Sequence, residues 1–151
     1  MTKQQHQALS QQDRHFVMEA ARGGTAEVKL SQLVNERASR DEVKQFGKHM
    51  IHDHTQANKE LMRLASGKGE KVSEELDEKH EKLMNRLSGL SGDEFDREYI
   101  KAMVQDHKKV VAEFEREASQ GQDEDLKHWA GKILPKLQQH LQMAQDLAKR
   151  H

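Results

Sequence analysis

Two short segments of this sequence repeat a pattern of residues that can bind a metal ion. MIHDHT spans residues 50–55 and MVQDHK spans residues 103–108, and each places a methionine, a branched apolar residue, one variable residue, an aspartate and a histidine in that order. Histidine is a common ligand of transition metals, and a carboxylate that accepts a hydrogen bond from the ring fixes its orientation. The repeat therefore predicts that His54 and His107 act together, with Asp53 and Asp106 beside them.

Two further polar residues, Glu27 and His140, stand in otherwise apolar helical stripes. Like His54 and His107, they have apolar neighbours three or four positions away along the chain. Residues with this spacing share one face of a helix. We therefore expect all four side chains to point toward the interior of the protein or toward a seam between helices.

The heights of these residues can be compared from the sequence, because residues equally far from a hairpin turn face each other in antiparallel helices. The midpoint of residues 27 and 54 falls near residue 40, where a turn is predicted. The midpoint of residues 107 and 140 falls within one helical turn of the predicted break at 121–123. One carboxylate and three imidazoles should thus lie at similar heights near the centre of the protein.

Three imidazoles and a carboxylate suit a divalent ion such as zinc, iron, manganese or copper, so we expect a divalent metal ion as the cofactor. The candidate metal-binding residues are Glu27, His54, His107, His140, Asp53 and Asp106. Two other interpretations remain open. The same residues can form a metal-free polar layer, in which Glu27 hydrogen-bonds to the histidines and to buried water, or a metal-free catalytic site.

Other candidate ligands receive a simpler interpretation. His80 lies between Leu76 and Leu83, and a single histidine on an apolar face is usually a tolerated boundary residue. Met50 and Met103 occupy ordinary stripe positions, so we interpret them as core residues and not as ligands of copper(I).

These residues must be positioned by helices, since no segment has the alternating or β-branched pattern of a strand. Apolar periodicity and breaks predict helices over about 13–38, 39–65, 70–88, 93–119 and 123–150. Ser39 with Glu42 and Ser91 with Glu94 form capping-box patterns at two helix starts. The helix over 70–88 is long enough to return the chain to the other end of the protein, which makes the helices before and after it parallel.

The predicted fold is therefore all-α: a ferritin-like four-helix bundle with a crossover helix between the second and third long helices. We expect a flexible N-terminal arm over residues 1–12, which lack apolar periodicity, and a single bundle domain over residues 13–150. Gly23 and Gly24 interrupt the first helix, so they either permit close approach of a neighbouring helix or mark a bend.

Composition excludes several classes of function. The 151 residues include 25 basic and 26 acidic ones, which gives a net charge of -1. A chain with this balance has no strong positive electrostatic field to attract nucleic acid. The absence of cysteine excludes disulfides, iron–sulfur ligation and a thiol nucleophile. No apolar run is long enough for a transmembrane segment, and the protein is expected to be soluble.

Four segments carry a resemblance to a known family: FVMEAARGGTAEVKLSQLV, VKQFGKHMIHDHTQANKEL, YIKAMVQDHKKVVAEF and LKHWAGKILPKLQQHLQMA. Over about residues 13–148 the chain resembles a bacterial family with a ferritin-like domain. Its members are often labelled predicted outer-membrane or secreted protein and are catalogued as a domain of unknown function. The resemblance implies a ferritin-like fold and, for most members, export through a cleaved signal peptide.

The family's recurring polar positions correspond to Glu27, Asp53, His54, Asn58, Asp106, His107 and His140 in this sequence. The chain departs from true ferritins, whose di-iron centre uses a Glu-x-x-His pair on each of two helices. Ile51 stands three positions before His54, and Leu137 stands three positions before His140.

Together these observations predict a metal-binding, ferritin-like module of the bacterial envelope, periplasmic or secreted, with a role in stress responses as one option. A cytoplasmic location stays open. The alternatives are a ferritin-like oxidase and a structural or interaction bundle with a metal-free polar layer. The sequence names no substrate, protein partner or oligomeric state, and an enzymatic activity is the less favoured interpretation.

Overall fold

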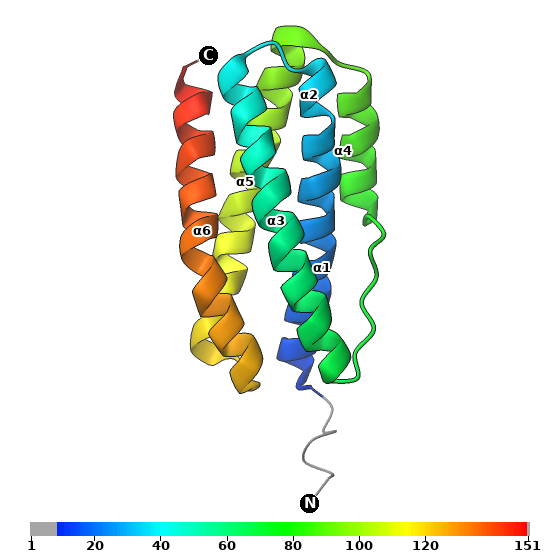
Figure 1. Ribbon diagram of the computed structural model, residues 1–151, viewed down its shortest axis with the longest axis vertical. Helices are drawn as coiled ribbons and strands as arrows, with labels where there is room; N and C mark the ends of the chain where they lie inside the picture. The colour runs from blue at the N-terminus through cyan, green and yellow to red at the C-terminus, as the bar shows by residue number, and fades with distance from the viewer. Residues whose placement is uncertain (1–8, 151) are drawn as a thin grey trace, which may run out of the picture.

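The structure is a computed structural model that describes residues 9–150, and within this range it contains helices and no strands. The helices are α1 (Gln11–Gln32), α2 (Val34–Arg37), α3 (Asp41–Gly67), α4 (Glu78–Ser88), α5 (Gly92–Gln120) and α6 (Glu124–Lys149) (Figure 1). The long helices α1, α3, α5 and α6 have 22 to 29 residues each. They form a helical bundle, in agreement with the predicted all-α class.

The connection between α3 and α5 decides the order of the bundle. α1 and α3 are antiparallel neighbours, as are α5 and α6, whereas α3 and α5 run in the same direction (Figure 1). The predicted crossover helix over 70–88 is shorter than expected, because residues 70–77 are not helical and α4 begins at Glu78. An extended residue advances the chain about twice as far as a helical one, so this segment covers the length of the bundle with less helix.

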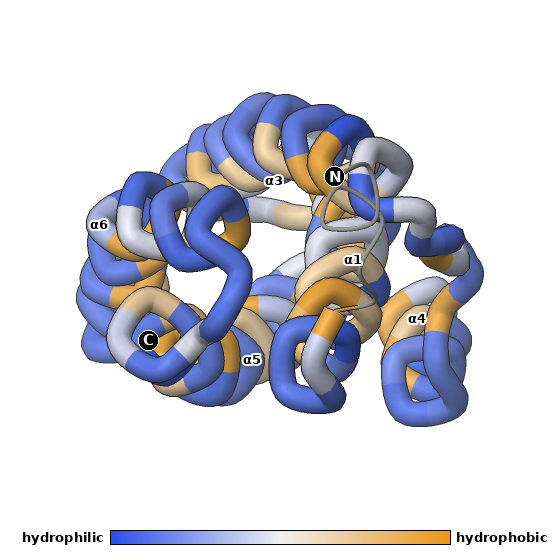
Figure 2. The backbone as a smooth tube through the Cα atoms, turned by 90° about the horizontal axis from the view of Figure 1, so that it is seen from below, coloured by the Kyte–Doolittle hydropathy of each residue, from blue (hydrophilic) through white to orange (hydrophobic). Residues whose placement is uncertain are grey.

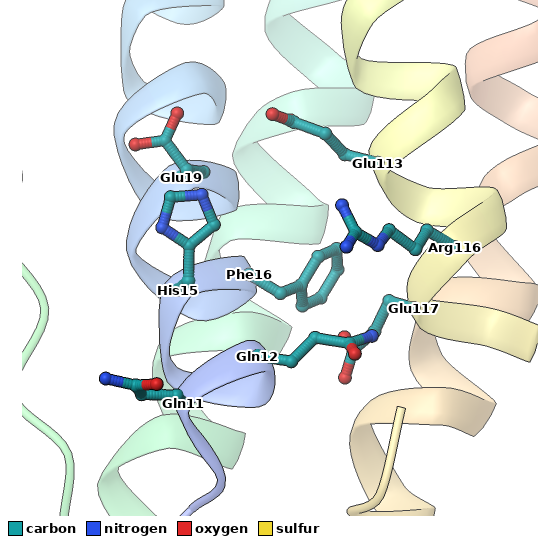
Figure 3. Close-up of a pocket in the computed structure, with 8 residues that line it drawn as sticks. All are labelled: Gln11, Gln12, His15, Phe16, Glu19, Glu113, Arg116 and Glu117. Carbon is teal, nitrogen blue, oxygen red and sulfur yellow. The ribbon is translucent and has the colours of Figure 1, made fainter. Parts of the chain in front are cut away.

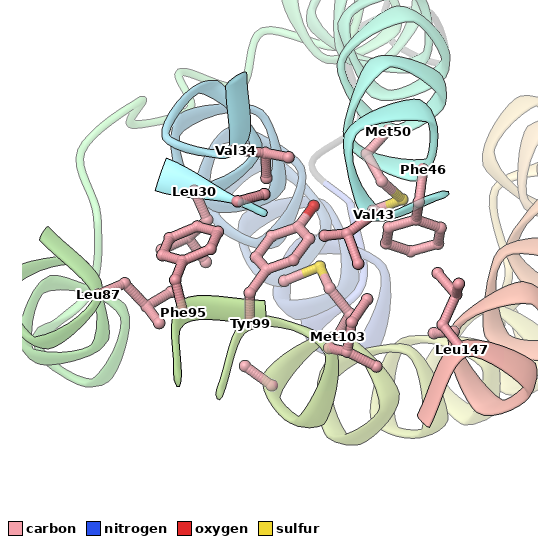
Figure 4. Packing of buried hydrophobic residues seen from close by; sticks show 14 residues of the cluster. Leu30, Val34, Val43, Phe46, Met50, Leu87, Phe95, Tyr99, Met103 and Leu147 are labelled. Carbon is pink, nitrogen blue, oxygen red and sulfur yellow. The ribbon is translucent and has the colours of Figure 1, made fainter. Parts of the chain in front are cut away.

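Two apolar clusters fill the bundle, one toward each end. The first lies around the α1–α3 turn and includes Phe46, Met50, Phe95, Tyr99 and Met103 (Figure 4). The second lies at the opposite end and is built around Phe16, Phe114 and Trp129, whose rings contact one another. In the view along the bundle, hydrophilic segments predominate on the outer sides of the helices (Figure 2). Met50 and Met103 are fully buried in the first cluster, so they are core residues, as predicted.

Two buried aspartates fix the turns between helices. Oδ1 and Oδ2 of Asp96 accept hydrogen bonds from the backbone N–H groups of Ser39 and Arg40, at 3.1 and 3.0 Å. The predicted capping box at Ser39 is therefore wrong, since α3 begins at Asp41 and Asp96 of α5 supplies the acceptor. At the other end, Asp13 accepts from the N–H groups of Gln122 and Asp123, at 3.2 and 2.8 Å.

Residues 1–8 of the predicted N-terminal arm lie outside the described residues. Within the rest of that segment, Leu9 is buried in the second cluster, and the Ser10 side chain accepts a hydrogen bond from the N–H of Asp13 at the start of α1. The division of the chain at residue 12 stays a prediction. In the described part of the chain, no helix is long and apolar enough to cross a membrane.

Candidate metal centre

Three histidines from three different helices meet between the two apolar clusters. His54 of α3, His107 of α5 and His140 of α6 are 7%, 1% and 1% exposed. Their ring centroids lie 5.4 to 5.8 Å apart, and one ring nitrogen from each lies within 4.8 Å of the other two. The histidines that the sequence places at similar heights therefore do converge.

The hydrogen bonds of two of these rings, His107 and His140, determine which of their nitrogens carry protons. Nδ1 of His107 lies 2.8 Å from the carbonyl oxygen of Met103, and Nε2 of His140 lies 2.7 Å from Oδ2 of Asp53. Because both partners only accept, each of these nitrogens donates its proton. The other nitrogen of each neutral ring then holds a lone pair.

Three ring nitrogens, one from each histidine, have no hydrogen-bond partner among the described residues. Nε2 of His54, Nε2 of His107 and Nδ1 of His140 are all buried and make no hydrogen bond. In ordinary protein interiors, buried polar atoms of this kind are nearly always paired. Three unpaired nitrogens facing a common centre therefore require an explanation other than packing.

The environment of the three rings keeps them neutral. Burial lowers the pKa of His54 well below its usual value, and the neighbouring His107 and His140 lower it further. Burial also lowers the pKa of His107 to about 4, against the opposing effect of the Met103 carbonyl. The pKa of His140 is lowered by burial in spite of Asp53. Near neutral pH the lone pairs are therefore free to bind a metal ion without displacing protons.

Glu27 of α1 lines the same small cavity as His54 and His107. The cavity has a volume of about 20 Å³, which is room for about one water molecule. Glu27 is 2% exposed, and its Oε2 has no hydrogen-bond partner. Burial raises the pKa of Glu27 well above its usual value, and the charge and hydrogen bonding of Asp106 raise it further. The carboxyl group is a potential fourth ligand once its proton is released.

The two aspartates of the repeated pattern lie outside the group of three histidines and serve different partners. Asp53 accepts the hydrogen bond from His140 of α6 and also lies 3.7 Å from Nζ of Lys136. Asp106 contacts Nε2 of His80 on α4, at 3.0 Å. Asp53 therefore orients a ring of the centre, whereas Asp106 connects the vicinity of Glu27 to α4.

His80 is a buried residue, 8% exposed, for which the sequence predicts only a boundary position. Its Nδ1 and Nε2 lie 2.8 and 3.0 Å from carboxylate oxygens of Asp77 and Asp106. The hydrogen bond to Asp106, which outweighs burial, raises the pKa of His80. Both ring nitrogens are thus occupied. Asp77 is also the N-cap of α4 and accepts a hydrogen bond from the backbone N–H of His80, a spacing that the sequence shows and that brings Asp77 close to the ring.

Three imidazole nitrogens can hold one divalent ion in a roughly tetrahedral arrangement with one position left over. For metal–nitrogen distances of about 2.0–2.1 Å, the ligating nitrogens would lie about 3.3 Å apart, so the rings need a small rotation to close on an ion. The hydrogen bonds to Met103 and Asp53 are the outer contacts that metal-binding histidines usually make. The donor set therefore fits a metal ion.

Comparison with known proteins places the chain among helical domains. The family model described as "Domain of unknown function (DUF4142)" matches residues 1–147. The chain is also similar to the crystal structure of a DUF305 fragment from Deinococcus radiodurans, with a TM-score of 0.84 and 14% sequence identity, over 96% of this chain and 100% of that chain. At this identity the likeness concerns the fold alone. No curated protein sequence matches the chain.

Proposed function

The chain belongs to the DUF4142 family, and we propose that it binds one divalent metal ion through His54, His107 and His140 in a ferritin-like bundle. The observation that carries this proposal is the set of three buried ring nitrogens without partners, which face one another across less than 5 Å. The parallel direction of α3 and α5 supports the ferritin-like arrangement (Figure 1).

A metal-free polar layer accounts poorly for these nitrogens. No hydrogen bond joins the three ring nitrogens in the described part of the chain, and leaving a buried donor or acceptor unpaired costs about 1–3 kcal/mol. The adjoining cavity of about 20 Å³ has room for about one water molecule, and His140 does not line it. A cation bound between the rings pairs with all three nitrogens at once, with the ring proton of His54 on Nδ1, so metal binding is the better explanation.

The ligand types favour zinc, with copper(II) as the main competitor. Neutral imidazoles suit zinc and copper, whereas magnesium, calcium and manganese prefer oxygen ligands. In the proposed site the fourth position is taken by water or by Glu27, whose carboxyl lines the cavity beside the histidines. Glu27 thus belongs to the proposal as an optional ligand, and Asp53 as the residue that orients His140.

A module that binds metal is favoured over an enzyme acting on organic substrates. The cavity next to the histidines has room for about one water molecule, so an organic substrate cannot reach the metal without movement of helices. The proposed location in the bacterial envelope, and a role in metal or stress homeostasis there, rest on the family resemblance of the sequence.

Elemental analysis of protein purified without an affinity tag tests the proposal directly, followed by zinc titration of the metal-free protein. We expect close to one zinc per chain. His54→Ala and His107→Ala should each lower zinc affinity at least about tenfold. His52→Ala provides the matched control, because His52 lies on the same helix and is exposed.

Melting curves with and without a chelator separate the proposal from the structural alternative. Zinc should raise the melting temperature of the wild-type protein and of His52→Ala, because a ligand that binds only the folded state stabilises it. His54→Ala and His107→Ala should lose this increase. Equal destabilisation of these variants with zinc and with chelator, together with a metal-free wild type, would show that the layer is structural.

A further inference from the structure

Three hollows with shared lining residues adjoin one another along the side of α1 that faces α5. The outer groove, of about 420 Å³, is lined by Phe16, Glu19, Glu113 and Glu117 among others (Figure 3). A middle cavity is lined by Glu19, Gly23, Glu27, Lys109 and Glu113. The inner cavity, already described, is lined by Glu19, Gly23, Glu27, His54 and His107.

Consecutive hollows share their walls. Glu19 and Glu113 line both the outer groove and the middle cavity. Glu19, Gly23 and Glu27 line both the middle and the inner cavity. We propose that this line of hollows, the α1–α5 path, is the route by which a divalent cation reaches the three histidines. The inference rests on the proposed metal-binding function and extends it to how the metal enters.

Carboxylates lie along the whole α1–α5 path. Glu19 and Glu113 project from facing helices where the outer groove meets the middle cavity, and Arg116 of α5 also lines the outer groove (Figure 3). Glu27, buried and with Oε2 unpaired, lies at its inner end. A row of acidic groups between low-dielectric walls attracts cations and offsets part of the loss of hydration as the ion moves inward.

Gly23 leaves the path open at its middle. A Cβ atom added at this position would meet nothing within 4 Å, whereas one at Gly24 would lie 2.0 Å from Oδ1 of Asn58. A side chain at position 24 would displace Asn58 of α3, whereas packing does not require a glycine at position 23. Glycine is also a poor helix former. A glycine at position 23 is explained if any larger side chain there would block the α1–α5 path.

An ion pair crosses the path near the surface. Nζ of Lys109 on α5 lies 3.7 Å from Oε1 of Glu19 on α1, and the two side chains are 56% and 26% exposed. Ion pairs this exposed are weak and are screened by salt. An arriving divalent cation can replace Lys109 at Glu19, so we expect this pair to slow the entry of metal without affecting its final binding.

The central test measures the rates and the equilibrium of zinc binding to Gly23→Leu in the full chain. A leucine fills the open space, so both association and dissociation should slow by about tenfold or more while Kd stays within about threefold. Gly131→Leu is the control, because Gly131 also lies inside a helix, where an added Cβ has one neighbour, the Cβ of Ala118 at 3.9 Å. Its rates should equal those of the wild type.

Two surface variants test the charges independently of the cavity. Lys109→Ala should raise the association rate about threefold and Glu19→Gln should lower it by a similar factor, with both effects shrinking at about 0.5 M salt. Glu115→Gln, an exposed change on the same helix as Lys109, is the control and should have no effect.

The outcomes separate this inference from the proposed function. If the wild type does not bind zinc, the proposed function fails and the path fails with it. If the wild type binds zinc but Gly23→Leu binds at the same rate, the path alone is wrong. A weaker Kd with an unchanged association rate would also overturn it, because Gly23 would then affect the site and not the route.

Discussion

Nε2 of His140 on α6 lies 2.7 Å from Oδ2 of Asp53 on α3. A carboxylate accepts hydrogen bonds, so this contact places the ring proton on Nε2 and leaves the lone pair on Nδ1. Nδ1 of His140 is the atom without a partner, in the group of nitrogens that also includes Nε2 of His54 and of His107. Asp53 thereby determines whether the ring of His140 presents a lone pair to the centre.

We predict from this contact that Asp53→Ala lowers zinc affinity by about 10–100-fold, because groups that orient a metal-binding histidine usually contribute this much. A competition titration against a zinc indicator measures the change. Asp53→Asn should recover part of the affinity, since the amide oxygen can still accept the ring N–H. Asp146→Ala, an exposed change on α6, serves as the control. An unchanged affinity for Asp53→Ala would mean that Asp53 does not orient His140.

The turn between α1 and α3 gives a prediction that does not depend on metal. Asp96 is fully buried and accepts from the N–H groups of both Ser39 and Arg40. Its replacement by alanine leaves these donors unpaired, so Asp96→Ala should lower the free energy of unfolding by about 2–4 kcal/mol. Urea denaturation in the presence of a chelator measures the loss.

Asp93→Ala is the matched control for Asp96→Ala. Asp93 lies in the first turn of α5, three residues before Asp96, is exposed, and accepts one hydrogen bond from Oγ of Ser39. Its loss should cost less than about 1 kcal/mol. Similar losses for the two variants would indicate that the charge near the start of α5, and not the fixed turn, is what stabilises the protein.

How much of the centre can be predicted from the sequence depends on the residue type. The inward direction of the three histidines follows from helical periodicity, and their similar height follows from their distances to the turns. Both can be predicted because long helices have a regular geometry. The partners of Asp53 and Asp106 do not follow. Successive residues in a helix are rotated by about 100°, so an aspartate next to an inward histidine points to a neighbouring helix whose position is set by the fold.

The connection between α3 and α5 shows a second limit of prediction from the sequence. Apolar residues over 70–88 predict one continuous helix, but the helix begins only at Glu78. The chain must bridge the length of the bundle, and that requirement is invisible in the local pattern. The burial of His80 follows from where α4 docks and is hidden for the same reason. So is the proximity of Asp13 and Glu117, which lie far apart in the sequence.

Glu117 provides a prediction about pH. The side chain is 1% exposed, and burial, followed by the neighbouring carboxyl group of Asp13, raises its pKa to about 8. Between its usual value near 4.5 and about 8, the unfolded chain releases this proton while the folded protein keeps it. Glu117 therefore lowers stability progressively as the pH rises through this range.

Glu117→Gln imitates the protonated side chain and should remove this pH dependence. The free energy of unfolding of the variant, minus that of the wild type, should increase between about pH 5 and pH 8 by up to about 1 kcal/mol per pH unit. Denaturation at several pH values with chelator present measures the difference. Glu115→Gln, exposed on the same helix, should show a constant difference. A constant difference for Glu117→Gln as well would mean that Glu117 is ionised in the folded protein.

The last prediction concerns iron oxidation, because some four-helix bundles bind two irons. Di-iron proteins with ferritin-like folds supply a glutamate from each of two helices and a Glu-x-x-His pair from each of the other two. Such carboxylates balance the charge as both irons are oxidised. In this chain Ile51 and Leu137 occupy the positions three residues before His54 and His140.

The structure also leaves few carboxylates to bridge two irons. Glu27 lines the inner cavity, but Asp53 is engaged by His140 and Asp106 by His80. Three imidazoles with one carboxyl suit a single ion, and a fold by itself does not carry an activity. We therefore predict no oxidation of ferrous iron above a buffer control, and no mineral core. Absorbance after adding ferrous iron in air tests this. Rapid, saturable oxidation that Glu27→Ala abolishes would show that the site holds two irons, with further carboxylates recruited by movement of Asp53 or Asp106.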